Sequence, residues 1–87
     1  MLIRTQNSIY DLTKEVITVH NPNHAAKEQE FYLMQYKLTK IGSLPGKPAT
    51  VKDHQTFIGN TVSINPDGCM YLWMGSSLII RTSELDI

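Results

Sequence analysis

Cysteine, net charge and long apolar runs are all scarce in this sequence. Its 87 residues include a single cysteine, Cys69, which excludes an internal disulfide network and a cysteine-rich metal cluster. Eight basic residues balance eight acidic ones, so no overall field draws the chain to nucleic acid or to an anionic membrane. No segment reaches the roughly 18–20 apolar residues of a membrane span, and none has the pattern of a signal peptide. We therefore expect a cytoplasmic protein without membrane contacts.

The length and composition predict one folded domain spanning residues 1–87. A chain of this size buries only about 60–65% of its unfolded surface and cannot support two cores. Hydrophobic residues make up 41% of the chain and charged residues 18%. This balance suits a packed core and lies far from the charge excess of disordered chains.

The clearest local signal is the segment TVSI-NPDG-CMYLW at residues 61–73. Asn65–Gly68 has the residue preferences of a type I turn followed by a left-handed glycine, which joins two antiparallel strands. Gly75–Ser77 is a second turn, and the branched run after it predicts a third strand. Residues 61–85 are therefore expected to form a three-stranded meander.

The rest of the chain also reads mainly as short strands. In the first 20 residues, polar segments at 6–8 and 13–15 separate two or three runs rich in β-branched residues. A further strand is predicted at 49–52. Six or seven short strands, mainly antiparallel, indicate an all-β protein with the architecture of a small barrel or sandwich. LIRT at 2–5 and IIRT at 79–82 are expected to be neighbouring strands that reduce open sheet edges.

Residues 24–41 fit two different periodicities. At helical spacing, Phe31, Met34, Leu38 and Ile41 form one stripe. At strand spacing, every second residue from Tyr32 to Leu38 is apolar or aromatic. We predict a short helix or a loop around residues 24–30 followed by a strand over 31–39, because aromatic residues cluster in the second part and the other elements are strands. The alternative is an α+β fold with one helix at 24–41.

No residue pattern supports catalysis or metal binding. His20 and His24 have the spacing of two ligands on a helix, but Pro22 between them excludes that helix. Cys69 with His54 as its base would be an enzyme candidate, yet its position directly after a tight turn favours a buried, inert thiol. We therefore predict no enzyme, no catalytic residue, no metal and no cofactor.

Aromatic and lysine side chains are the candidates for a binding surface. On a small barrel, exposed aromatic rings flanked by lysines stack on nucleotides or single-stranded nucleic acid. Tyr71 and Trp73 share one face of their strand, and Trp73 in the core is the favoured interpretation. Exposure of the pair would instead mark an interface with a partner or with a second subunit of a homo-oligomer. The candidate ligand- or partner-binding residues are Tyr32, Tyr36, Tyr71, Trp73, Lys37 and Lys40.

Three short segments resemble a known class of proteins. The opening MLIRTQNSIY, GKP at 46–48 and the closing RTSELDI are similar to the pattern of small, uncharacterised proteins encoded by phages and prophages. The resemblance covers the termini and hardly touches the middle of the chain. It implies a phage or mobile-element origin, a location in the host cytoplasm and a host-directed role such as countering a bacterial defence. It carries over no binding residues.

These observations favour a small cytoplasmic protein that binds rather than catalyses. We expect it either to interfere with a host protein or to sequester a small nucleotide-like ligand. One alternative is a small barrel that binds single-stranded nucleic acid through Lys37, Lys40, Lys47 and Lys52 with Tyr32 or Tyr36. Another alternative is a structural phage subunit. Nucleic acid is the less favoured partner because the chain has no net positive charge.

Overall fold

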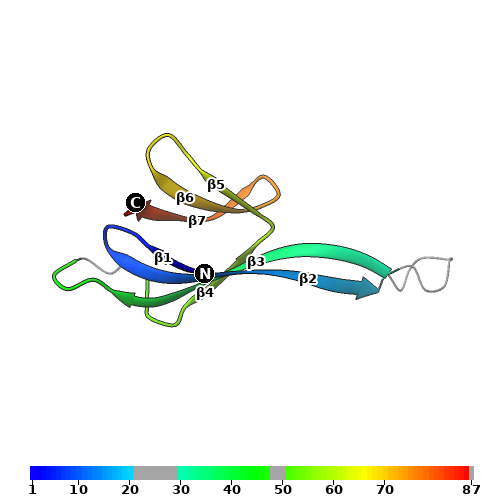
Figure 1. Ribbon diagram of the computed structural model, residues 1–87. Coiled ribbons are helices and arrows are strands. Elements are labelled where there is room, and N and C mark those ends of the chain that lie inside the picture. Colours follow the sequence, from blue (N-terminus) through cyan, green and yellow to red (C-terminus); the bar gives the residue numbers. More distant parts are fainter. Residues whose placement is uncertain (21–29, 48–50, 87) are drawn as a thin grey trace.

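The chain folds into two antiparallel β-sheets. The computed structural model describes residues 1–20, 30–47 and 51–86, with the side chains of residues 18–20 and 30–33 excepted. Within these residues, β1 to β4 form one sheet in that order and β5 to β7 form the other (Figure 1). The strands are β1 (Leu2–Arg4), β2 (Ser8–His20), β3 (Glu30–Ser43), β4 (Thr56–Gly59), β5 (Thr61–Ile64), β6 (Cys69–Met74) and β7 (Ser77–Glu84). The all-β prediction is confirmed.

A helix over residues 24–41 is wrong wherever the structure describes that segment. From Glu30 onward the chain is strand β3, which pairs with β2 from Ser8↔Ser43 to His20↔Glu30. The helical stripe fails because Leu38 is fully buried, whereas Met34 and Ile41 are 44% and 46% exposed. The short helix predicted around residues 24–30 lies outside the described residues, except that residue 30 belongs to the strand. The described parts of the chain contain no helix that could cross a membrane.

Two strand boundaries differ from the sequence prediction. Thr13, Lys14 and Glu15 do not interrupt β2, because all three side chains are exposed and polar residues are tolerated at exposed positions of an antiparallel strand. Residues 51 and 52 are not in a strand, and residues 48–50 lie outside the described segments. The strand of this region is β4 instead.

The C-terminal meander forms as predicted. The Asn65 carbonyl accepts a 2.9 Å hydrogen bond from the Gly68 N–H, and Gly68 has the left-handed φ of 80° that its turn requires. Gly75, with a φ of 61°, closes the β6–β7 turn in the same way. The turn residues therefore place β5, β6 and β7 side by side.

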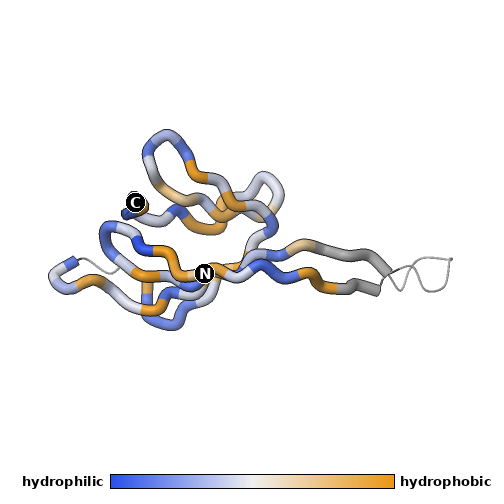
Figure 2. Tube along the Cα trace, in the orientation of Figure 1, coloured by the Kyte–Doolittle hydropathy of each residue, from blue (hydrophilic) through white to orange (hydrophobic). Residues whose placement is uncertain are grey.

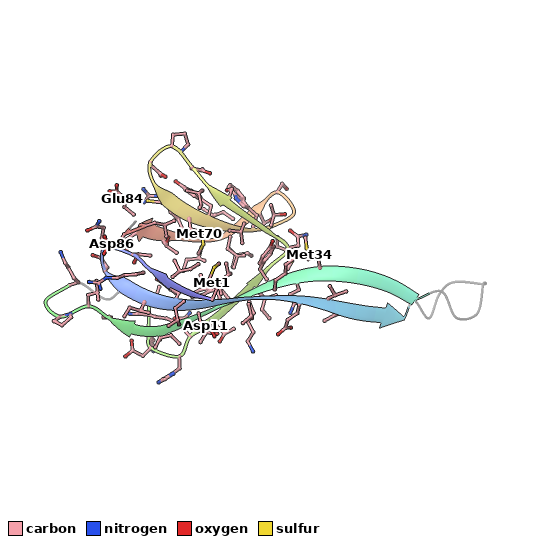
Figure 3. The ribbon with its side chains drawn as sticks, in the orientation of Figure 1. Met1, Asp11, Met34, Met70, Glu84 and Asp86 are labelled. Atoms are coloured by element: carbon pink, nitrogen blue, oxygen red, sulfur yellow. The ribbon has the colours of Figure 1, made fainter. Side chains whose placement is uncertain are left out.

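The core lies between the two sheets, which stack as the layers of a sandwich. Apolar stretches occur on the strands of both layers (Figure 2), and Met70 points from β6 toward the four-stranded sheet (Figure 3). The buried cluster consists of Tyr10, Leu12, Leu38, Met70 and Leu72. The Cys69 side chain is also buried, as the sequence predicted.

The two terminal segments are neighbours, as the LIRT and IIRT echo predicted. Thr5 and Leu85 form an isolated antiparallel bridge. The Asp86 N–H donates to the Arg4 carbonyl at 3.0 Å, and the Arg4 Nε lies 3.1 Å from an Asp86 carboxylate oxygen. The pairing partners are residues 84–86 rather than IIRT itself. This contact joins the edge of one sheet to the edge of the other.

A two-stranded arm projects from this body. It consists of residues 15–20 of β2 and 30–35 of β3, and it extends well beyond the β5–β7 sheet (Figure 1). The protein measures 56 × 27 × 20 Å, and its radius of gyration is 15.8 Å. A compact domain of this length would have a radius of gyration of about 12 Å. The arm accounts for this elongation.

Candidate binding surface

The outward face of the β5–β7 sheet carries two stacked aromatic rings. Along β6, Met70 and Leu72 point into the core, so Tyr71 and Trp73 point away from it. The two ring centroids are 6.0 Å apart and the ring planes differ by 12°. Both side chains are half-buried. Trp73 is therefore not in the buried core, where the sequence favoured it, and neither ring is fully exposed.

The NPDG turn holds Tyr71 in place. Asp67 accepts hydrogen bonds from the Tyr71 hydroxyl and, at 2.9 Å, from the Cys69 N–H. Arg81, which lies opposite Tyr71 on β7, donates from Nε to the Tyr71 hydroxyl at 2.9 Å and from Nη2 to Asp67 at 3.2 Å. Its guanidinium carbon also lies 5.8 Å from the centre of the Tyr71 ring. The Asp67 carboxylate thus accepts hydrogen bonds both from the backbone at the turn and from the Tyr71 side chain.

A second set of hydrogen bonds holds Trp73. The Trp73 Nε1 donates to the Ser63 Oγ at 3.0 Å, and the Ser63 hydroxyl donates to the Asn65 side-chain oxygen at 3.1 Å. These bonds satisfy the polar atom of the indole within the protein. We call Tyr71, Trp73 and Arg81 the aromatic platform.

The charges of the platform are fixed at neutral pH. The hydrogen bond from Tyr71, followed by the bond from the Cys69 N–H, holds the pKa of the Asp67 carboxyl below its usual value. The same bond to Asp67 raises the pKa of the Tyr71 hydroxyl. Asp67 therefore stays ionised and Tyr71 stays protonated, because each partner stabilises the hydrogen-bonded state of the other.

The remaining candidate residues do not gather around this platform. Tyr36 packs against the core cluster, whereas the neighbouring Lys37 is exposed on the opposite face of β3. The side chain of Tyr32 lies outside the described residues. Lys47 and Lys52 are exposed in the segment between β3 and β4. The residues of the predicted nucleic-acid surface are thus distributed over different faces.

Lys40 is not a surface residue. Its side chain is completely buried, and its ammonium donates to the Ser43 Oγ at 2.7 Å and to the Val51 carbonyl. Asp53, which is largely exposed, lies 3.5 Å from the same nitrogen. The buried cation holds the segment after β3 against the sheet, where it cannot reach a phosphate in solvent.

An open groove of about 350 Å³ lies where the arm leaves the body. Met34, seen at the base of the arm in Figure 3, is one of its lining residues. The walls come from Ile17, Met34 and Gln35 of the arm, from Gly59, Asn60 and Thr61 at the β4–β5 corner, and from Met74 at the end of β6. These side chains are apolar or neutral, so the groove offers packing surface and amide groups but no acid or base.

Histidine and cysteine do not form a site in the described structure. His54 is exposed, whereas Cys69 is buried on β6. The side chain of His20 and the whole of His24 lie outside the described residues. Among the described residues, no group of three His, Cys, Asp or Glu side chains is placed to hold a metal ion.

Arg81 of the platform, and Asp67 and Ser63 that hydrogen-bond to it, were not candidates from the sequence. Two signals for them exist in the chain. Asp67 is the third residue of the NPDG turn, within reach of a ring on the strand that follows, and Arg81 lies opposite that ring once the meander is in register.

No protein-family model, curated protein or solved structure matches this chain.

Proposed function

We propose that the protein is a non-enzymatic binding protein that docks another protein on its aromatic platform. The observation that supports this most directly is the cluster of Tyr71, Trp73 and Arg81 on the outward face of a sheet. Tyrosine, tryptophan and arginine are the residues most enriched among interface hot spots. Their hydrogen bonds to Asp67 and Ser63 already restrict their rotamers, which lowers the entropy lost on binding.

A protein fits this platform better than a nucleotide. A nucleobase needs a free ring face, but the neighbours of Tyr71 already include Trp73 and the Arg81 guanidinium. The ionised Asp67 within the cluster repels phosphate. Arg81 is partly neutralised by its contact with that carboxylate. The apolar ring surface that remains suits the side chains of a protein partner.

The resemblance of the termini to phage-encoded proteins makes a bacterial host protein the partner to test first. Under this proposal the chain acts in the host cytoplasm by occupying a surface of that protein, as a counter-defence factor would. The mode of action requires no cofactor.

The experiment compares variants in quantitative affinity capture from bacterial lysate, followed by calorimetry with the purified partner. Trp73→Ala and Arg81→Ala each remove one member of the platform. Ile58→Ala is the matched control, because Ile58 is an apolar side chain, 42% exposed, on the four-stranded sheet. We expect wild type and Ile58→Ala to bind the same protein, and each platform variant to bind it at least tenfold more weakly, as hot-spot truncation does.

Two results would contradict the proposal. One is a partner whose affinity is the same for wild type, Trp73→Ala and Arg81→Ala. The other is a nucleotide that raises the melting temperature of wild type but not of Trp73→Ala, which would assign the platform to a small ligand. Circular dichroism and thermal melts of each variant separate loss of binding from loss of folding.

A further inference from the structure

The outer edge of β2 is unpaired along the arm. On that side β1 pairs with β2 from Ile9 to Asp11, and Met1 continues the pairing by exchanging hydrogen bonds of 2.8 and 2.9 Å with the N–H and carbonyl of Leu12. Among the described residues, none pairs with this edge beyond Leu12. Strand edges of this kind are templates for pairing with another chain.

The hydrogen bonds of Leu12 show which groups face that edge. Both main-chain groups of Leu12 point away from β3, and this orientation recurs at every second residue of an antiparallel strand. Lys14 and Val16 therefore direct their N–H and carbonyl groups outward. An added strand would find a regular ladder to continue, because the register shift of β2 lies earlier, at Ile9 and Tyr10.

The most exposed large hydrophobic side chains among the described residues are Val16 on this edge and Met1 and Leu2 at the neighbouring β1. Met1, Leu2 and Val16 have exposed fractions of 76%, 72% and 68%, the highest among the large hydrophobic residues. Val16 is opposite Met34, which is itself 44% exposed, on the adjacent strand. An isolated two-stranded ribbon is marginally stable in water, so a third strand would stabilise the arm.

We propose that the arm is a self-association element, in which the β2 edges of two copies pair antiparallel about a two-fold axis at Val16. The four strands then follow the order β3, β2, β2 of the second copy and β3 of the second copy. Val16 is opposite its own mate, and Met34 flanks it on either side. One face of the joined ribbon thus carries an unbroken row of four apolar side chains.

Charge disfavours two neighbouring registers of this pairing and is compatible with a second copy as the occupant. A two-fold axis at Lys14 or at Glu15 would place identical charges directly opposite each other, which is destabilising in a sheet. An axis at Val16 instead places Glu15 opposite Ile17 of the second copy. It also makes Val16 a hydrogen-bonded pair, in which the two copies exchange both N–H to carbonyl bonds. The edge is therefore complementary to itself in this alignment.

Disulfide trapping tests the axis directly. In a Cys69→Ala background, Val16→Cys places two thiols on strands whose Cα atoms are about 5.5 Å apart, within the range of a disulfide. Thr13→Cys is the matched control on the same exposed strand, because its two copies are about 20 Å apart in this register. We expect mild oxidation to convert Val16→Cys to a covalent dimer at least tenfold faster than Thr13→Cys.

Molar mass measurements on chains that keep Cys69 provide the second readout. We expect wild type to change from monomer to dimer as its concentration rises, whereas Val16→Lys, which places two ammonium groups at the axis, stays monomeric. A wild type that is monomeric at millimolar concentration, a dimer that persists in Val16→Lys, or equal trapping of both cysteine variants would overturn the proposal. Trp73→Ala is expected to dimerise normally, so this test is independent of the aromatic platform.

Discussion

The buried ammonium of Lys40 connects the end of β3 to the segment that leads to β4. It contacts Ser43 at the end of β3, and the Val51 carbonyl and Asp53 in the segment that leads to β4. The main chain of Lys40 also pairs with His54 and Gln55. A lysine in an alternating strand is normally predicted to be exposed. Its burial here depends on a segment that returns over the strand, which no local pattern reveals.

Replacing Lys40 with methionine keeps most of the buried stem and removes the charge. We expect Lys40→Met to lower the free energy of unfolding by about 1–3 kcal/mol, because the Val51 carbonyl and Ser43 lose their donor. Asp53→Asn should cost less than about 1 kcal/mol, since that carboxylate is 58% exposed. Urea unfolding of both variants measures the difference. Equal losses would show that the pair, rather than the hydrogen bonds, stabilises this segment.

Asp67 makes the stability of the folded protein depend on pH in the acid range. Its pKa is lowered in the folded state, first by the Tyr71 hydroxyl, so its contribution to stability is present above the usual value of 3.8. That contribution is lost as the pH falls through the lower, folded-state pKa. We expect wild type to be more stable than Asp67→Asn at pH 7, with the gap closing below about pH 4. Urea unfolding at each pH, followed by the fluorescence of Trp73, measures it.

The fluorescence is specific because Trp73 is the only tryptophan in the sequence. Tyr71→Phe removes the same hydrogen bond from the other side and should reproduce the pH dependence of Asp67→Asn. Asparagine can still accept the bond from the Cys69 N–H, so the turn is retained in the variant. A gap between wild type and Asp67→Asn that is unchanged from pH 7 to pH 3 would contradict the assignment.

At the scale of elements, Gly59 is the point where the chain passes from one sheet to the other. It ends β4, and the next residue, Asn60, donates its N–H to the Trp73 carbonyl at 2.8 Å. A Cβ atom on Gly59 would lie 2.5 Å from that carbonyl oxygen and 2.7 Å from the Leu72 side chain. The close approach of β4 to β6 therefore requires glycine.

Gly59→Ala should accordingly be one of the most damaging conservative changes in the chain. We expect it to lower the free energy of unfolding by about 2–3 kcal/mol, because the contact involves backbone that cannot move without separating the sheets. Gly42→Ala is the control, since a Cβ there meets nothing within 4 Å. Thermal melts and urea unfolding compare the two. Similar stabilities for both variants would contradict a tight crossing at Gly59.

Elements defined by turn chemistry were predictable, and elements defined by packing were not. Asn65–Gly68 and Gly75 specify their turns through backbone conformations that few other residues adopt, so the meander follows from the sequence. By contrast, β2 continues through Thr13–Glu15, where all three side chains are exposed, and a polar run of this kind looks like a loop in the sequence. β4 has only four residues and little alternation. Its pairing depends on the Gly59 crossing, which a single sequence does not show.

At the scale of the whole molecule, the two candidate interaction surfaces lie on different parts of the protein, one on the two-layer body and one on the projecting arm. The aromatic platform lies on a rigid three-stranded sheet, whereas the free edge of β2 lies on a ribbon outside the body. Tyr71 and Trp73 could be proposed from the sequence because they alternate with core residues on one strand. Asp67 and Arg81 were harder to propose, because their contact depends on the register of β6 with β7 as well as on the turn. The free edge was equally hidden, because it depends on where β1 stops pairing.

The junction between the terminal segments also constrains how the protein folds. The Ser83 hydroxyl donates to the Thr5 hydroxyl across 78 residues of sequence, and Thr5 is fully buried. During synthesis, the two hairpins β2–β3 and β5–β6 can form as soon as their strands have emerged. The edge that contains Thr5 must wait until residues 83–86 have left the ribosome. Contacts so distant in sequence form slowly, so we expect closure of the sandwich to be a late step in folding. Until that step, Thr5, Ser8 and the first strand remain accessible to solvent and to other chains.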